Sequence, residues 1–257
     1  MWGDYAPVGL GIITIGLLVY VLRKVTRLHR VVREVEASLG NHLSHKTSTL
    51  FSQLEALHAL QMALGLEKPL PPTRGWAISP DLLVLLANHV LHARPKLIVE
   101  CGSGVSTIVL ARSVKLAGAG HVYSLEHLED FAAATRDQLE AHGLADFATV
   151  IYAPFREYRL GGQSWLWYSL DGFPDSGIDL LLVDGPPASE IPLARYPAGP
   201  LLFPRLNPGA AVFLDDADRK GEGAIVDYWA REFPSMRHET ERTEKGCVVL
   251  HQGLAFP

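Results

Sequence analysis

Residues 97–107 read Leu-Ile-Val-Glu-Cys-Gly-Ser-Gly-Val-Ser-Thr. The apolar start of this stretch predicts a buried strand, and Gly102 and Gly104 predict a tight loop directly after it. Because glycine has no Cβ, the loop backbone can turn sharply and approach a ligand closely. A helix is expected to follow and to include residues 108–111, with its first N–H groups facing the loop. We therefore expect a ligand at the carboxyl end of a parallel sheet, with a plain tight turn as the alternative.

Two residues of this stretch bear on the kind of ligand. A dinucleotide-binding loop has a third glycine at the position of Thr107, and it holds a diphosphate at the helix N-terminus. Here the predicted strand ends at Glu100, whose carboxylate is a poor neighbour for a diphosphate. A cationic ligand without phosphate groups is favoured instead.

Residues 100–107, Glu-Cys-Gly-Ser-Gly-Val-Ser-Thr, resemble motif I of the class I S-adenosylmethionine-dependent methyltransferases. The resemblance extends over residues 76–252. It implies that Glu100 lies near the amino end of the methionine part of the cofactor and that the backbone of residues 102–104 packs against the cofactor. Ser106 stands where many members of the family have a further glycine.

Residues 121–125 predict a second strand, which ends at Glu126. An acidic residue at this place, about 20 residues beyond the loop, accepts the ribose hydroxyls in nucleotide-binding sheets. The resemblance implies the same role for Glu126, and the Glu126-His127 pair resembles the same branch of the family. A solvated carboxylate is the alternative. The implied cofactor-binding residues are Glu100, Gly102, Ser103, Gly104, Ser106, Thr107, Glu126 and His127.

Residues 178–184 form a nearly continuous apolar run that ends in Asp184, and this predicts a central strand buried on both faces. Residues 184–187, Asp-Gly-Pro-Pro, resemble motif IV of the same family. The resemblance implies that Asp184 points into the crevice where the methyl donor meets its acceptor. We expect Asp184 to be the catalytic residue that takes the proton from a hydroxyl acceptor, with a cation that lowers the pKa of the acceptor as the alternative.

Asp215, Asp216 and Asp218 follow the strand predicted for residues 206–214. Carboxylates this close together need solvent, a cation or protonation. With Asp184 they predict an oxygen-rich site for Mg²⁺. The resemblance to metal-dependent catechol-type O-methyltransferases implies the ligands Asp184, Asp215 and Asp216. That subfamily has Asn where Asp216 stands and a lysine after its first aspartate, so metal dependence stays open.

The predicted elements together indicate an α/β fold, a Rossmann-like doubly wound sheet of seven mostly parallel strands. Residues 237–243 and 247–251 predict a closing antiparallel hairpin. Helices are expected over residues 82–91, 131–143 and 224–233, the first opened by Ser79 as N-cap. The aromatic residues near 165–168 are expected in a loop.

Residues 6–22 form an uncharged run of 17 residues, and the cluster Arg23, Lys24, Arg27, Arg30 and Arg33 follows it. As a helix the run spans about 25 Å, just enough for a bilayer. The positive charges after the run predict an uncleaved single-pass anchor in the plasma membrane, with the N-terminus outside and the catalytic domain cytoplasmic. A cleaved signal peptide and a buried or interfacial helix are the alternatives.

Four segments are predicted: a transmembrane anchor at 1–24, an amphipathic helical stalk at 25–66, a proline-rich linker at 67–75 and a methyltransferase domain at 76–257. Leucines and valines recur at helical spacing in the stalk, in one set before Gly40-Asn41 and a second set after it. The stalk either forms a coiled coil in a homodimer or packs on its own catalytic domain.

Residues 65–257 hold 17 Lys and Arg against 24 Asp and Glu, a net charge of −7. Nucleic acid is therefore not an expected partner. Cys101 and Cys247 lie in apolar runs and are expected to be buried, reduced thiols.

The sequence therefore predicts a membrane-anchored methyltransferase that uses S-adenosylmethionine, with Mg²⁺ left open, to methylate a small or lipid-linked acceptor at oxygen. An NAD-dependent oxidoreductase shares the sheet and Glu126, but the third glycine and a Tyr/Lys proton relay are absent. A catalytically silent membrane adaptor is the other alternative.

Overall fold

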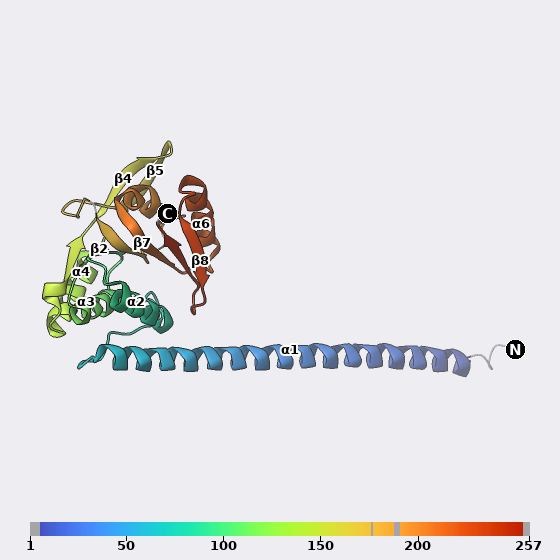
Figure 1. Ribbon diagram of the computed structural model, residues 1–257. Helices are drawn as coiled ribbons and strands as arrows, with labels where there is room; N and C mark the ends of the chain where they lie inside the picture. The colour runs from blue at the N-terminus through green and yellow to red at the C-terminus, as the bar shows by residue number, and fades with distance from the viewer. Residues whose placement is uncertain (1–5, 176, 188–190, 254–257) are drawn as a thin grey trace. The chain divides into compact units, whose positions relative to one another are not determined.

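The computed structural model describes residues 6–175, 177–187 and 191–253, with only the backbone for residues 6–13. The chain divides into two units, Met1–Phe51 and Ser52–Pro257. Helix α1, Ala6–Leu64, is continuous through the boundary between them (Figure 1). All the described strands belong to the second unit, whose start lies inside the predicted stalk.

The second unit is built on a seven-stranded sheet with the order β3-β2-β1-β6-β7-β9-β8. The first five strands of this order run parallel, while β9 pairs antiparallel with both β7 and β8. The Rossmann-like sheet and its C-terminal hairpin are thus confirmed. The bounds are β1 Leu97–Cys101, β2 His121–Glu126, β3 Ala148–Tyr152, β6 Ile178–Val183, β7 Leu206–Asp215, β8 Arg237–Glu241 and β9 Cys247–His251.

Both faces of the sheet are buried under helices, and successive side chains of a strand point to opposite faces. In β6, Leu180 and Leu182 belong to one core and Leu181 and Val183 to the other. The first core contains residues of α2 (Pro80–Ala93), α3 (Val105–Ala117) and α4 (Glu129–Ala141). The second contains residues of α5 (Ala198–Leu202) and α6 (Lys220–Glu232). The apolar run that predicted a central strand thus reflects helices on both sides.

The start of α2 differs from its prediction in how it is capped. Ser79 has the extended backbone of an N-cap residue, but its side chain caps nothing. The backbone N–H of Asp81 instead donates to Gln53 Oε1 at 3.1 Å, and Asp81 Oδ1 accepts from the N–H of Leu82 at 2.9 Å. The last turns of α1 therefore pack with the catalytic domain, where Leu60 and Leu64 join the first core.

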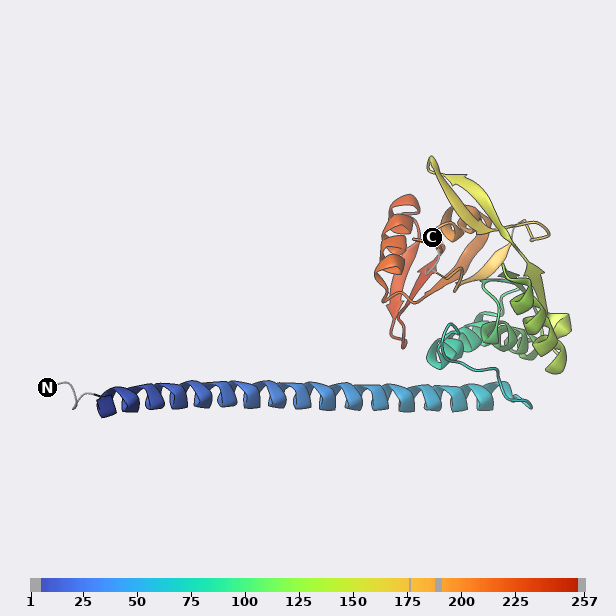
Figure 2. The same ribbon diagram turned by 180° about the vertical axis from the view of Figure 1, so that it is seen from behind.

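The aromatic segment expected as a loop is half of a second, two-stranded sheet. Strands β4, Phe155–Leu160, and β5, Gln163–Tyr168, pair antiparallel. Gly161 and Gly162 join them, both at positive φ, as a type I′ two-residue hairpin turn requires. Figure 2 shows this ribbon projecting from the main sheet. Trp167 and Tyr168, at its base, are buried in the second core.

The expected transmembrane helix is not confirmed. Within the part of the chain that the structure describes, no helix is both long and apolar enough to cross a membrane. Residues 1–5 and the side chains of residues 6–13, which together make up the first half of the expected anchor at 1–24, lie outside the described residues. Helix α1 runs unbroken through Gly40-Asn41, between the two sets of apolar residues in the stalk. Pairing of the stalk in a homodimer stays a prediction, as does the plasma-membrane location.

Candidate active site

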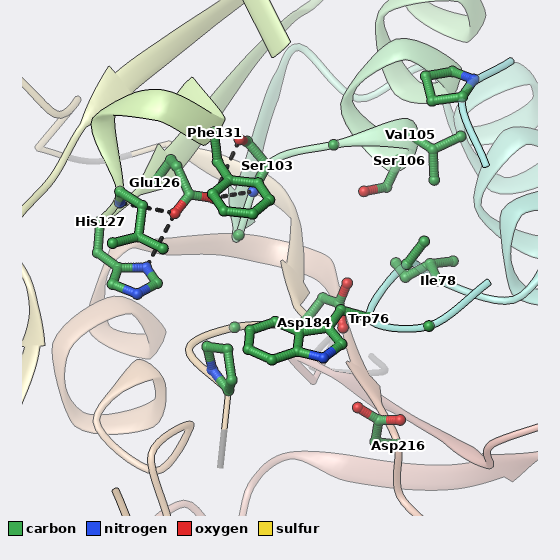
Figure 3. Close-up of a pocket in the computed structure, with 18 of the residues that line it drawn as sticks. Trp76, Ile78, Ser103, Val105, Ser106, Glu126, His127, Phe131, Asp184 and Asp216 are labelled. Carbon is green, nitrogen blue, oxygen red and sulfur yellow. Dashed lines mark hydrogen bonds and ion pairs between the residues drawn. The ribbon is translucent and has the colours of Figure 1, made fainter. Parts of the chain in front are cut away.

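A cavity of about 600 Å³ opens at the carboxyl ends of β1, β2 and β6. The glycine loop after β1 forms one wall, and the segment after β6 forms another. Residues 71–72 and 74–78, from the proline-rich linker onward, close a third side. Figure 3 shows Ser103, Glu126 and His127 at one end, and Asp184 and Asp216 at the other. Of the expected site residues, those that line the cavity are Gly102, Ser103, Gly104, Ser106, Glu126, His127, Asp184 and Asp216.

The glycine loop needs glycine at its first position. Gly102 has φ +96°, which residues with a Cβ rarely adopt. A Cβ there would lie 3.5 Å from the backbone nitrogen of Gly185, an ordinary contact distance, so the backbone angle sets the requirement. The loop is held to β2, since the N–H of Gly102 donates to the carbonyl of Leu125 at 2.9 Å. The loops after β1 and β6 therefore meet at Gly102.

Several polar groups contact the side chain of Glu126 at one end of the cavity. Its Oε2 accepts from the backbone N–H and hydroxyl of Ser103 at 3.1 and 3.2 Å. Its Oε1 accepts from the N–H of Leu128 at 3.0 Å and lies 3.0 Å from Nδ1 of His127. Burial alone would raise the pKa of Glu126, but these contacts outweigh it and hold the pKa below its usual value. The carboxylate is thus charged and fixed in place.

The ring of His127 is held from its other side by the two-stranded sheet. It stacks on Phe155 with the ring centres 4.3 Å apart and the planes 9° from parallel. Tyr168, at the end of β5, lines the cavity nearby. The β4–β5 sheet therefore supports one end of the site.

Glu100 and Thr107 were expected beside the cofactor but do not line the cavity. Both are fully buried behind the glycine loop. The Thr107 hydroxyl donates to Oε2 of Glu100 at 2.6 Å and accepts from the N–H of Gly104 at 3.0 Å. Burial raises the pKa of Glu100 to about 7. This carboxyl group supports the loop instead of contacting a ligand directly.

The three aspartates expected as metal ligands do come together. One carboxylate oxygen from each of Asp184, Asp215 and Asp216 lies within 4.8 Å of the others. Asp215 is fully buried and does not line the cavity, whereas Asp184 and Asp216 do. Asp216 has φ +60°, a left-handed conformation that Asp and Asn adopt more readily than most residues.

The guanidinium of Arg195 lies among these carboxylates. Its Nη2 is 2.7 Å from Oδ2 of Asp216 and 3.4 Å from Oδ1 of Asp184. Its Nη1 donates to the backbone carbonyl of Asp215 at 2.7 Å. Burial raises the pKa of Asp184 well above its usual value, and nearby Asp215 raises it further. Arg195 opposes this rise.

Residues 99–217 match the model of a family described as a methyltransferase domain. The chain carries a class I methyltransferase domain. The matched region begins in β1 and ends just after Asp216, so it contains both ends of the cavity. No curated protein sequence matches the chain.

Several solved structures share the fold of the methyltransferase domain. An SAH-bound methyltransferase from Podospora anserina has a TM-score of 0.54 at 16% identity, covering 76% of this chain and 86% of that one. An O-methyltransferase from Bacillus cereus in complex with SAH has a TM-score of 0.54 at 17% identity, covering 78% of this chain and 90% of that one. The O-methyltransferase TomG from Streptomyces achromogenes, in complex with SAM, has a TM-score of 0.53 at 17% identity, covering 80% of this chain and 96% of that one.

The methyltransferase domain does not fit a divalent metal at its aspartates. Both carboxylate oxygens of Asp216 already face cations, since Oδ2 contacts Arg195 and Oδ1 lies 2.9 Å from Nη2 of Arg219. Asp184 shares the same guanidinium. A metal ion would have to displace a buried arginine whose side chain is only 3% exposed. The expected Mg²⁺ ligands are therefore in place, but the carboxylates of Asp184 and Asp216 already contact arginine side chains, while Arg195 contacts Asp215 only through its backbone carbonyl.

Sequence reasoning missed Arg195, and no local pattern indicates it. The residue belongs to the segment between β6 and α5, and it reaches the aspartates only through the fold. Trp76 and Phe131 were also missed, although both line the cavity with strongly exposed rings, at 72% and 57%. By contrast, the Gly161-Gly162 pair between two short alternating runs is a hairpin signal that could have been recognised.

Proposed function

We propose that the chain is an S-adenosylmethionine-dependent O-methyltransferase acting on a small-molecule acceptor. The observation that carries this is a single cavity joining Glu126 to Asp184 across the glycine loop. A donor that binds both a carboxylate at β2 and the loop after β1 has its far end near Asp184. Donor and acceptor can therefore meet inside one cavity.

The cofactor end suits a ribose and a sulfonium ion. The carboxylate of Glu126 is charged, buried and aligned by Ser103 and Leu128, which suits it to accept hydrogen bonds from ribose hydroxyls. Among the described residues, the arginines that line the cavity are already paired, Arg74 with Glu244 and both Arg195 and Arg219 with Asp216, so a diphosphate finds no unpaired arginine or lysine there. The solved structures with the same fold were obtained with SAM or SAH, which supports the same donor here.

The acceptor end suits removal of a proton from oxygen. The methyl group passes from the sulfonium to the acceptor oxygen as the carbon–sulfur bond breaks and the carbon–oxygen bond forms. The hydroxyl proton goes to the carboxylate of Asp184, which lines the cavity at the end away from Glu126 (Figure 3). Holding donor and acceptor in line supplies most of the acceleration, because orienting two reacting groups can lower the activation free energy by about 7–11 kcal/mol.

Calorimetric titration of the full chain with S-adenosylmethionine, S-adenosylhomocysteine and NAD tests the donor. We expect binding of the first two and none of NAD. Preferential binding of NAD would overturn the proposal in favour of the oxidoreductase.

A labelled-methyl transfer assay on a small-molecule cell extract tests the reaction. We expect Asp184→Asn to lose transfer while it still binds S-adenosylhomocysteine. Asp171→Asn is the matched control, because that carboxylate is 72% exposed and pairs with Arg156 outside the cavity. Full transfer by Asp184→Asn would remove Asp184 as the base, and the adaptor alternative predicts no transfer by any variant.

A further inference from the structure

Arg195 is the most deeply buried cation that lines the methyltransferase cavity among the described residues. Its side chain is 3% exposed. A buried guanidinium is costly unless its N–H groups find partners. Arg195 finds them in Asp216, Asp184 and the carbonyl of Asp215. A fourth acid, Glu222, approaches its Nε at 3.9 Å and is itself 2% exposed.

The cation in turn offsets the repulsion among the surrounding carboxylates. Three carboxylate oxygens within 4.8 Å of one another, two of them on fully or nearly fully buried residues, repel strongly without a counter-ion. The planar guanidinium can contact several oxygens at once, which a lysine ammonium does less well. Arg219 adds a second contact to Asp216, but its side chain is 53% exposed, so Arg195 is the interior cation.

We propose that Arg195 takes the place of a divalent cation at the acceptor end, so that methyl transfer by this chain needs no metal. The inference rests on the proposed function. Arg195 contacts the carboxylate oxygens that a metal would need on Asp184 and Asp216. The positive charge that steadies the acceptor end is thus built into the chain. Arg195 acts as a positioning residue, because its Nη2 contacts both Asp184 and Asp216.

The proposal predicts a metal response that appears only when the arginine is removed. Thermal unfolding of the full chain is measured with increasing MnCl₂ or MgCl₂. We expect the Tm of the unmodified chain to stay unchanged beyond the general effect of salt. In Arg195→Ala the three aspartates lose their cation, and we expect a Tm that is lower without metal and rises saturably with Mn²⁺. A merely structural arginine would lower the Tm without creating this metal response.

Two further variants complete the test. Arg195→Lys keeps one positive charge at the site, and we expect a lowered Tm with no saturable response to Mn²⁺. Arg156→Ala is the matched control, because it removes an arginine paired with Asp171 on the surface. We expect Arg156→Ala to behave as the unmodified chain does in both metals.

Several outcomes would overturn the proposal. One is a saturable rise in the Tm of the unmodified chain with Mg²⁺ or Mn²⁺. Another is loss of labelled-methyl transfer in EDTA that Mg²⁺ restores. A folded Arg195→Ala that ignores Mn²⁺ also contradicts it, and if this variant does not fold, the unmodified chain and Arg195→Lys decide. Titration with S-adenosylmethionine tests the proposed function separately, since the unfolding experiment does not depend on methyl transfer.

Discussion

The hydroxyl of Thr107 joins Glu100 to the glycine loop, because it donates to the carboxyl group at 2.6 Å and accepts from the N–H of Gly104 at 3.0 Å. One side chain on α3 thus connects the buried end of β1 to the wall of the cavity. The loop conformation depends on a carboxyl group that does not line the cavity.

Replacing Thr107 with Val keeps the shape of the side chain and removes both hydrogen bonds. We expect the free energy of unfolding to fall by about 1–3 kcal/mol, because a buried carboxyl group and an N–H lose a partner. Urea denaturation measures this. Thr240→Val, on the exposed strand β8, is the control and should change stability little. Equal stabilities of the two variants would contradict the role of the Thr107 hydroxyl.

Glu100 makes stability depend on pH in a defined window. Its pKa is about 7 in the folded chain against an ordinary value of 4.5, so the folded state binds this proton more tightly. The stabilisation is fully present below about pH 4.5, and the unfolding free energy falls by about 3 kcal/mol as the pH rises to about 7. The Glu100→Gln variant does not ionise at this position, so its unfolding free energy does not fall for this reason. We expect its unfolding free energy, relative to the unmodified chain, to increase between about pH 5 and about pH 8.

The control for that comparison is Glu239→Gln, at an exposed carboxylate on β8. Its stability should follow that of the unmodified chain across the whole range. If the curves of Glu100→Gln and the unmodified chain run parallel, Glu100 does not titrate in this window.

Gly102→Ala should weaken both the fold and the site. The positive φ of +96° strains any residue with a Cβ, and we expect a loss of about 1 kcal/mol or more in stability. Gly223→Ala, inside α6 with open space around it, should instead be neutral or stabilising by up to about 1 kcal/mol. Thermal unfolding distinguishes the two, and a Gly102→Ala as stable as Gly223→Ala would show that the loop tolerates a Cβ.

Glu126→Gln should weaken binding of S-adenosylmethionine. Hydrogen bonds to a charged group contribute about 1.5–3 kcal/mol, so we expect Kd to rise about 10- to 100-fold. Calorimetry measures it. Glu129→Gln, three residues further on and paired with Arg136 at the surface, is the matched control. An unchanged Kd in a folded Glu126→Gln variant would place the ribose elsewhere.

The parts of the site that could be predicted are those encoded by a local pattern. A strand followed by Gly102 and Gly104, an acid at the next strand end and the run ending in Asp184 each depend on neighbours in sequence. Each lies where its pattern indicates, at the carboxyl edge of the sheet. Glu100 was expected beside the cofactor but does not line the cavity. Alternation along β1 points its side chain to the face of the sheet covered by α3, where it contacts Thr107.

Arg195 could not be predicted, because its partners are 11 to 21 residues away in sequence and meet it only after the sheet has formed. An acidic cluster predicts a cation but not whether the cation is a metal or an arginine. Packing of the α1 end against α2 escaped prediction for the same reason, since amphipathic spacing does not name a partner.

The backbones of Gly102 and Gly185 lie directly against each other, so only these two chain segments separate the donor side of the cavity from the acceptor side. A lengthened or bulkier segment after β6, introduced to admit a larger acceptor, would press on the loop that receives the donor. Changes of acceptor preference should therefore arise more readily at the rim, around Trp76 and the linker, than at the floor between the two strands.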